Sequence, residues 1–193
     1  MITTTTYDEA IERTLYTPEE IAQAIGRLAA EIARDHAGQP LLLLGVLKGA
    51  LYAAVDLARA IARVPDGPSE IFVDYLCVSS YGNATRSSGE VRILKDAGMP
   101  VAGQNVVIVE DIVDNGLTLQ YLQALLRGRN PAQLRSCVLF DKPYHRLVDV
   151  PIDYVGLRSP DEFVVGYGLD YQELFRNLPY LAQLRAQVFS QEG

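Results

Sequence analysis

The stretch from Asn105 to Leu126, "NVVIVEDIVDNGLTLQYLQALL", passes from a β-branched apolar run through an acidic turn into a helical pattern. The run "NVVIVEDI" is apolar on both faces, as a parallel strand covered by helices must be. Glu110 and Asp111 still belong to the end of this strand, where helix capping does not need them, and Asp114 follows shortly afterwards. The stretch therefore predicts a buried central strand that carries carboxylates to one edge of a sheet.

On either side of this stretch, apolar runs of strand length alternate with helical patterns after a short lead-in at residues 1–16. We expect helices at 17–36, 50–63 and 117–130, an edge strand at 91–96, and further strands at 41–46, 70–78, 105–112, 135–141, 153–157 and 163–169. This alternation predicts an α/β fold with a twisted, mostly parallel sheet flanked by helices. Ligands of such sheets bind beyond the carboxyl ends of the strands. A length of 193 residues, 49% of them hydrophobic, fits a single domain spanning residues 1–193.

The composition argues against several classes of protein. A formal net charge of -7 disfavours a nonspecific nucleic-acid binder, because such proteins need a cationic surface. The longest apolar stretch, residues 40–58, is interrupted by Gly45, Lys48 and Asp56, so no membrane span is expected. The N-terminal residues lack the basic-then-apolar order of a secretory signal, so we expect a cytoplasmic protein.

The cysteines and histidines do not indicate a metal site. Cys77 and Cys137 lie in apolar, strand-like runs, where buried and reduced thiols are expected rather than a disulfide. His36 and His145 are far apart in the sequence and in no metal-ligand spacing, so zinc is not expected.

The turn at Asn115 and Gly116 has the features of a phosphate site. Gly116 allows the chain to turn tightly, and the amides of residues 115–118 would face outward at the start of a helix, with Thr118 adding a hydroxyl donor. Neither "GxxxxGK" nor "GxGxxG" is present after a strand. ATP bound by a P-loop and a Rossmann dinucleotide are therefore not expected.

The three carboxylates before this turn indicate what carries the phosphate. Carboxylates beside a phosphate would repel it unless they bind sugar hydroxyls, hold a cation or meet a positive charge that develops in the reaction. A pentose that carries a phosphate and a leaving group offers all three. Glu110 and Asp111 would bind the ribose hydroxyls, and Asp114, one helical turn beyond Glu110, would lie near the anomeric carbon. Acids at the start of a helix also complement its dipole. On composition alone, helix capping and a functional role are equally supported. The position of Glu110 and Asp111 within the strand favours a functional role.

The motif "VVIVEDIVDNGLTL" resembles the phosphoribosyl-pyrophosphate-binding motif of the type I phosphoribosyltransferases, and "VEDIVD" is the form of their hypoxanthine-guanine members. The similarity continues in order along the chain. "LLGVLKGA" resembles the pyrophosphate loop, "SSYG" the flexible catalytic loop, "LFDKP" the lysine-bearing strand end, and "DEFVVGYGLDYQELFRNLPYL" the purine-binding segment and C-terminal tail. The resemblance implies the type I fold, with a small hood formed by the terminal segments.

The resemblance also gives roles to residues of two loops. It implies that the Leu47–Lys48 peptide is cis and that the amides of Lys48 and Gly49 contact pyrophosphate. Ser80 and Tyr81 match the lid over the reaction centre, which keeps water away from an oxocarbenium-like sugar. Without the resemblance, Lys48 would be interpreted as a surface lysine at a strand end.

The C-terminal half matches the family's purine-binding residues. Lys142 would donate to the 6-oxo group of a purine, which favours hypoxanthine or guanine over adenine. Phe163 would stack on the purine ring, and the backbone of Val164 would pair with its edge. Asp170 matches the second magnesium ligand, and Arg176 matches an arginine that reaches the pyrophosphate. Without the resemblance, Phe163 would be interpreted as a core residue. Asp170 as a helix cap and Arg176 as part of a surface ion pair would then be as plausible as their functional roles.

Two positions depart from the family pattern. Asn115 stands where many relatives carry threonine or serine, so an amide replaces one hydroxyl contact to the 5′-phosphate. Leu117 stands where some members carry a lysine, whose side chain need not touch the substrate.

The resemblance implies transfer of a 5-phosphoribosyl group from phosphoribosyl pyrophosphate to hypoxanthine or guanine in purine salvage, with Mg²⁺ as cofactor. Asp114 would act as general base, and Glu110 and Asp111 would steady the positive charge on the sugar. Glu110, Asp111 and Asp170 are the expected metal ligands. A xanthine-preferring enzyme and an RNA-binding regulator on the same fold stay open as alternatives, and the acidic balance counts against the second. Relatives suggest a homodimer or homotetramer.

Overall fold

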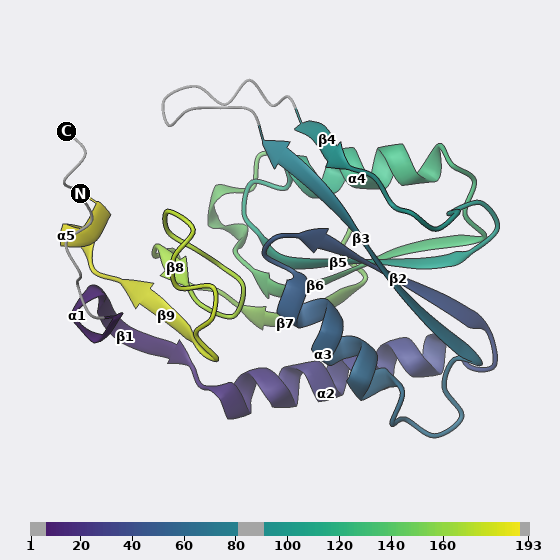
Figure 1. The fold of residues 1–193 in the computed structure, drawn as a ribbon, viewed down its shortest axis with the longest axis horizontal. Helices are drawn as coiled ribbons and strands as arrows, with labels where there is room; N and C mark the ends of the chain where they lie inside the picture. Colours follow the sequence, from purple (N-terminus) through teal and green to yellow (C-terminus); the bar gives the residue numbers. More distant parts are fainter. Residues whose placement is uncertain (1–6, 81–90, 190–193) are drawn as a thin grey trace.

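The computed structural model describes residues 7–80 and 91–189, which form two β-sheets (Figure 1). The larger sheet has six strands in the order β4-β3-β2-β5-β6-β7, and the smaller has three in the order β1-β9-β8. Neighbouring strands of the larger sheet are parallel, except that β3 and the edge strand β4 are antiparallel. The predicted α/β fold, with a mostly parallel sheet, flanking helices and a small hood, is confirmed.

The elements of the larger sheet lie close to their predicted positions. The strands are β2 (Pro40–Leu47), β3 (Glu70–Ser80), β4 (Val91–Lys95), β5 (Asn105–Val113), β6 (Gln133–Asp141) and β7 (Tyr154–Arg158). The helices are α2 (Pro18–Asp35), α3 (Leu51–Ile61) and α4 (Leu117–Arg127), and a 3-10 turn, η1 (Pro143–His145), follows β6. At the start of α2, Thr17 and Glu20 form a capping box, in which each side chain accepts a hydrogen bond from the backbone N–H of the other.

Alternate side chains of the central strands enter two separate cores. Leu41 and Leu43 of β2 pack with α2 and α3, whereas Leu42 and Leu44 pack with α4. Helices α2 and α3 lie on one face of the sheet and α4 on the other (Figure 1). Burial on both faces explains why β2 is apolar throughout instead of alternating with polar residues. With both faces covered, a ligand site is expected at the carboxyl ends of the strands.

The smaller sheet forms the hood, made of β1 (Ile11–Tyr16), β8 (Val164–Val165) and β9 (Leu181–Leu184), with the short helices α1 (Tyr7–Ala10) and α5 (Ala186–Phe189) beside it. The sequence prediction lacks β1 and β9, and the strand that it places at 163–169 is shorter and belongs to the hood. The sequence of β1, "IERTLY", has no clear alternation of apolar and polar residues. It becomes a strand because it pairs with β9, from the opposite end of the chain.

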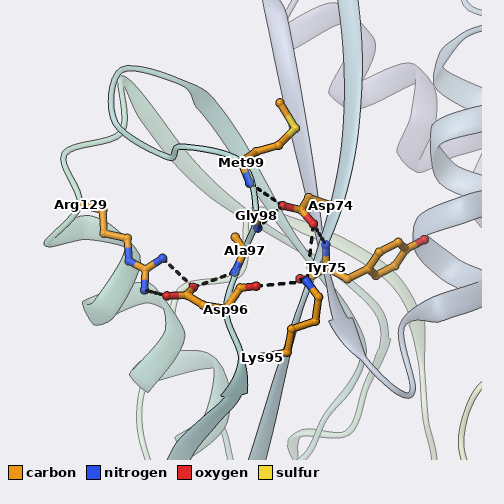
Figure 2. Close-up of polar contacts among 8 residues, drawn as sticks. All are labelled: Asp74, Tyr75, Lys95, Asp96, Ala97, Gly98, Met99 and Arg129. Carbon is orange, nitrogen blue, oxygen red and sulfur yellow. Dashed lines mark hydrogen bonds and ion pairs between the residues drawn. The ribbon is translucent and has the colours of Figure 1, made fainter.

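Two carboxylates fix the segment that leads from β4 back to the sheet (Figure 2). Asp74 of β3 accepts hydrogen bonds from the backbone N–H groups of Gly98 and Met99, at 2.7 and 2.8 Å. Asp96 binds the Arg129 guanidinium through both carboxylate oxygens, each at 2.7 Å. The segment is therefore tied both to β3 and to the loop after α4, which stabilises β4 at the edge of the sheet.

The structure tests the expected burial of the two cysteines and the expected lack of a membrane span. Both cysteines are free thiols, and Cys137 is buried as predicted. The prediction that Cys77 is buried is wrong, because its strand pairs with the edge strand β4 and leaves this residue partly exposed. Within residues 7–80 and 91–189, no helix has the length and apolarity needed to cross a membrane.

Candidate active site

A cavity of about 210 Å³ opens at the carboxyl ends of β2 and β5. Glu110 and Asp111 of β5, Gly49 after β2 and Thr118 at the start of α4 are among its lining residues. These segments meet because β2 and β5 are parallel neighbours in the sheet. The peptide between Leu47 and Lys48, at the end of β2, is cis as predicted.

Gly49 and Gly168 allow the strand ends and the hood to approach each other closely. A Cβ atom on Gly49 would overlap Asp111 Oδ2, so any other residue here would displace the Asp111 side chain or the loop after β2. A Cβ atom on Gly168, whose φ is +103°, would overlap the backbone carbonyl of Gly49. The two glycines therefore bring together three segments that are far apart in the sequence.

The two carboxyl groups of the cavity have raised pKa values. Burial raises the pKa of Glu110 well above its ordinary 4.5, and the neighbouring charge of Asp111 adds to the effect. Burial also raises the pKa of Asp111 from 3.8 to about 6, although hydrogen bonds from backbone N–H groups and the charge of Arg176 oppose the shift. Two buried acids that resist ionisation are typical of a site that meets a positive charge or a cation when it is filled.

Replacement of Asp111 by asparagine should make the protein more stable above pH 6. A folded-state pKa of about 6 lies above the unfolded value of 3.8, so ionising Asp111 destabilises the folded protein, and its contribution to stability is lost as the pH rises from about 4 to about 6. We expect Asp111→Asn to raise the free energy of unfolding at pH 7 by up to about 3 kcal/mol. Urea unfolding between pH 4 and pH 8 measures this difference, which should shrink toward zero at pH 4. A difference in stability that does not vary with pH would contradict the raised pKa of Asp111.

Asp114 lies in the turn after β5, and its relation to Glu110 differs from the prediction. Strand β5 continues to Val113, so the expectation that Asp114 lies one helical turn beyond Glu110 is wrong. The chain stays extended there because β5 pairs with β6 as far as Val113. Asp114 therefore lies in the turn itself and not on a helix.

The turn between β5 and α4 combines a left-handed glycine with the start of a helix. Asn115 Oδ1 accepts a hydrogen bond from the N–H of Leu117 at 3.0 Å, and Gly116 adopts a φ of +86° just before α4. Leu117 is the first residue of α4, so the N–H groups at the start of this helix lie next to Thr118 in the cavity wall. A helix N-terminus in this position favours a bound anion.

Lys142 connects the turn with the segment that leads into the hood. Its Nζ lies 3.8 Å from Asp114 Oδ2 and 3.8 Å from Asp161 Oδ1, and it donates a hydrogen bond to the carbonyl of Glu162 at 3.1 Å. Asp114 Oδ1 is buried and has no hydrogen-bond partner among the residues that the structure describes. A carboxylate oxygen that can accept a proton therefore lies close to an ammonium donor.

Phe163 and Val164 follow this contact directly. Phe163 is 42% exposed, and its ring makes an edge contact with the ring of Tyr171, with 5.7 Å between the centroids. Val164 is buried in β8. A partly exposed aromatic residue, on which a planar ligand could stack, therefore follows the residue whose carbonyl Lys142 binds.

Lys48 and Arg176 both face the carboxylate of Glu173. Lys48 Nζ lies 2.7 Å from Glu173 Oε2, and Arg176 Nη2 lies 3.3 Å from Glu173 Oε1. Arg176 Nη2 also lies 2.7 Å from Asp170 Oδ1. Because Glu173 is exposed, an anionic ligand can take its place between the two cations.

The two predicted lid residues fall at the limit of the described chain. Ser80 is the last residue of β3, and Tyr81 lies outside the described residues. Their assignment to a lid stays a prediction.

The predicted metal ligands do not form one preassembled cage. Across the two described ranges, no group of three Asp, Glu, His or Cys side chains is placed to hold a metal ion. Glu110 and Asp111 line the cavity, whereas Asp170 is paired with Arg176. Mg²⁺ commonly binds one or two carboxylates together with oxygens of a substrate phosphate. The residues present fit a cation that is bound in that way.

Comparison with known proteins shows which family the chain belongs to. The phosphoribosyl transferase domain family matches residues 13–172. The chain belongs to this family. It is 45% identical to the hypoxanthine-guanine phosphoribosyltransferase of Bacillus subtilis (strain 168), over 93% of this chain and 96% of that protein. It is 42% identical to the enzyme of that name from Streptococcus mutans, over 95% and 98% of the two chains.

Solved structures of the family share the fold. A crystal structure of a hypoxanthine phosphoribosyltransferase from Staphylococcus aureus superposes with a TM-score of 0.88 at 39% identity, over 97% of this chain and 98% of that one. A structure of the Trypanosoma cruzi hypoxanthine phosphoribosyl transferase superposes with a TM-score of 0.87 at 40% identity, over 96% of this chain and 97% of that one. The family resemblance that the motifs indicate is confirmed.

The structure also brings three charged residues to the site that the sequence analysis does not single out. Asp161 lies beside Lys142, Glu173 beside Lys48, and Arg146 beside the turn after β5. Asp161 and Glu173 lie within the quoted purine-binding segment and Arg146 follows "LFDKP" by three residues, but closeness in sequence alone does not identify a contact. Their positions depend on segments that come together only in the folded chain.

Proposed function

We propose that this protein transfers the 5-phosphoribosyl group of phosphoribosyl pyrophosphate to hypoxanthine or guanine, which yields IMP or GMP and pyrophosphate for purine salvage. A bond forms between purine N9 and C1′ of the sugar, and the bond from C1′ to a pyrophosphate oxygen breaks. The imidazole proton of the purine passes to Asp114, which acts as the general base. The names of the bacterial relatives support the choice of substrates.

The observation that carries the proposal is the position of Lys142. It lies between Asp114, which has a carboxylate oxygen without a partner in the described chain, and Glu162, whose next residue is the partly exposed Phe163. A purine stacked on Phe163 would place its 6-oxo group near Lys142 and its imidazole edge near Asp114. The backbone of Val164 is proposed to pair with the opposite edge of the purine.

The cavity is proposed to hold the ribose and its 5′-phosphate. Glu110 and Asp111 accept hydrogen bonds from the ribose hydroxyls and stabilise the positive charge that develops on the sugar. The backbone amides of residues 115–118, with the Thr118 hydroxyl, bind the phosphate at the start of α4. Burial disfavours the ionised form of both carboxyl groups, and a positive charge on the sugar would favour it.

The pyrophosphate is proposed to lie between the loop after β2 and the hood. The backbone amides of Lys48 and Gly49 bind it from one side, and Arg176 binds it from the other in place of Glu173. Glu110, Asp111 and Asp170 are the residues that would hold Mg²⁺, which would neutralise the charge of the leaving group. Ser80 and Tyr81 are proposed to cover the reaction centre.

Pyrophosphate release by the purified protein tests this function. Hypoxanthine, guanine, xanthine, adenine and uracil are supplied in separate reactions with phosphoribosyl pyrophosphate and magnesium. We expect release with hypoxanthine or guanine that stops when magnesium is chelated. Faster release with xanthine would reassign the base, and the absence of release with every base would favour a regulator that has kept the fold.

Lys142→Ala should weaken purine binding without weakening the binding of the sugar phosphate. Loss of a charged donor to the 6-oxo group should raise the KM for hypoxanthine about tenfold or more. The KM for phosphoribosyl pyrophosphate should stay within about twofold, because the ribose and phosphate contacts are made by other residues.

Lys95→Ala provides the control for this measurement. Lys95 also donates to a backbone carbonyl, that of Tyr75 at 2.6 Å, but it lies on β4 (Figure 2). Neither KM should change in this variant. Equal rises of both KM values in Lys142→Ala would contradict the role in base recognition.

A homodimer or homotetramer and a single domain spanning residues 1–193 stay predictions. Sedimentation of the purified protein measures the first, and limited proteolysis measures the second.

A further inference from the structure

The turn between β5 and α4 directs its carbonyl groups toward a single segment, residues 142–147. The N–H of Lys142 donates to the carbonyl of Val113, and the N–H of Leu147 donates to the carbonyl of Asn115, each at 2.9 Å. These bonds hold the two ends of the turn. The carbonyl between them, that of Asp114, is bound by a side chain.

That side chain is Arg146. Its Nε donates to the carbonyl of Asp114 at 2.9 Å, and its Nη2 donates to the carbonyl of Val113 at 3.3 Å. The guanidinium also forms an ion pair with Asp141, the last residue of β6. The Arg146 side chain is 20% exposed, so its contacts are largely shielded from water. One planar side chain therefore connects the end of β6 with two successive peptide groups of the turn.

Gly116 makes room for this side chain. A Cβ atom on Gly116 would lie only 3.0 Å from Cδ of Arg146, closer than an ordinary van der Waals contact. The glycine thus serves two purposes, the left-handed φ of +86° and the passage of the arginine stem behind the turn. Arg146 packs against the back of the turn, on the side of its carbonyl groups.

The direction of the carbonyls determines the direction of the amides. In a trans peptide the C=O and the next N–H point in opposite directions. When the carbonyls of Val113, Asp114 and Asn115 are held toward residues 142–147, the N–H groups of residues 114–116 point away from that segment. A phosphate group that approaches from the other side meets a set of aligned donors.

We propose that Arg146 is a positioning residue that holds the amides of this turn in the orientation that binds the 5′-phosphate. The inference rests on the proposed function, because it takes the turn to be the phosphate site. Arg146 acts through the backbone of the turn and does not itself contact the ligand. The fixed turn also sets the position of the Asp114 carboxylate.

Binding of IMP and inosine to Arg146→Gln tests the proposal, because the two ligands differ only in the 5′-phosphate. Dissociation constants are measured by calorimetric titration of the full chain. We expect the constant for IMP to rise about tenfold or more, as expected when hydrogen bonds from a charged group are lost, and that for inosine to change less than about twofold. Equal changes for the two ligands, or no change for either, would overturn the proposal.

Arg27→Gln is the matched control for a purely structural effect. Arg27 Nη2 also donates to two backbone carbonyls, those of Val155 and Gly156 at 3.0 and 2.6 Å, but these belong to β7. This variant should lose stability without changing the ratio of the two dissociation constants. A change in that ratio as large as that of Arg146→Gln would show that the effect is not specific to the turn.

Two further variants keep the test valid if Arg146→Gln does not fold. Arg146→Lys keeps the charge beside Asp141 but cannot bind two carbonyls with a planar fork, so it should restore the melting temperature more fully than the affinity for IMP. Asp141→Asn should also weaken the binding of IMP more than that of inosine, but by less than Arg146→Gln does. If either variant weakens both ligands equally, the inference is wrong.

Failure of the inference can be distinguished from failure of the proposed function. If the wild-type protein releases no pyrophosphate with any base, the proposed function fails, whatever the variants do. If the wild-type protein is active and Arg146→Gln keeps the wild-type ratio of dissociation constants, only the positioning role fails.

Discussion

Asp114→Asn is expected to lower kcat by about 100-fold or more while it leaves the affinity for phosphoribosyl pyrophosphate nearly unchanged. An amide cannot take the imidazole proton of the purine, but it has almost the same shape as the carboxylate. In the structure, Asp114 Oδ1 has no hydrogen-bond partner within the described residues, and Oδ2 lies 3.8 Å from Lys142 Nζ. In the proposed mechanism, this carboxylate accepts the proton of a purine that Lys142 holds.

Asp161→Asn is the matched control for this experiment. The Asp161 carboxylate also lies 3.8 Å from Lys142 Nζ, and its side chain is 45% exposed compared with 46% for Asp114. Steady-state kinetics should give a kcat for this variant within about threefold of wild type, because loss of a nearby charge does not remove the base. Equal turnover of Asp114→Asn and wild type, or an equally large loss in Asp161→Asn, would remove Asp114 from the proposed mechanism.

Gly49→Ala is expected to lower kcat/KM by about 100-fold or more. The added methyl group would overlap Asp111 Oδ2, so either the carboxylate or the loop after β2 must move. Neither group can move far, because Asp111 lies on a buried strand end and the Gly49 carbonyl packs against Gly168. A displacement of about 1 Å at a reacting centre costs on the order of 100-fold in rate. The same overlap should destabilise the fold by about 1–3 kcal/mol.

Gly26→Ala separates this effect from the general consequences of replacing a glycine. Gly26 lies within α2, and a Cβ atom there would have no neighbour within 4 Å. Alanine at this position should stabilise the protein by about 0.5–1 kcal/mol and leave kcat/KM unchanged. Thermal unfolding and the pyrophosphate-release assay measure the two quantities. A Gly49→Ala enzyme with nearly wild-type kcat/KM would show that the close contact with Asp111 is not needed for activity.

The larger sheet could be predicted from the sequence because local patterns determine its elements. Strands β2 and β5 are apolar on both faces, and α2 begins at a threonine followed by proline and two glutamates. The hood could be predicted only as a feature of the family. Strands β1 and β9 lack a clear pattern of their own, and they exist because opposite ends of the chain pair with each other.

The sequence by itself determined the α/β fold, the family, the acidic strand end of β5 and the residue types available for chemistry. Each of these depends on neighbours within a short stretch of chain, where periodicity and motif spacing are visible. Only the tertiary structure decided that Lys142 lies between Asp114 and Asp161, that Glu173 occupies the place between Lys48 and Arg176, and that Arg146 supports the turn. These contacts join segments from different strand ends and from the hood. Their distances depend on how the sheet and the hood pack together, which no local pattern in the sequence specifies.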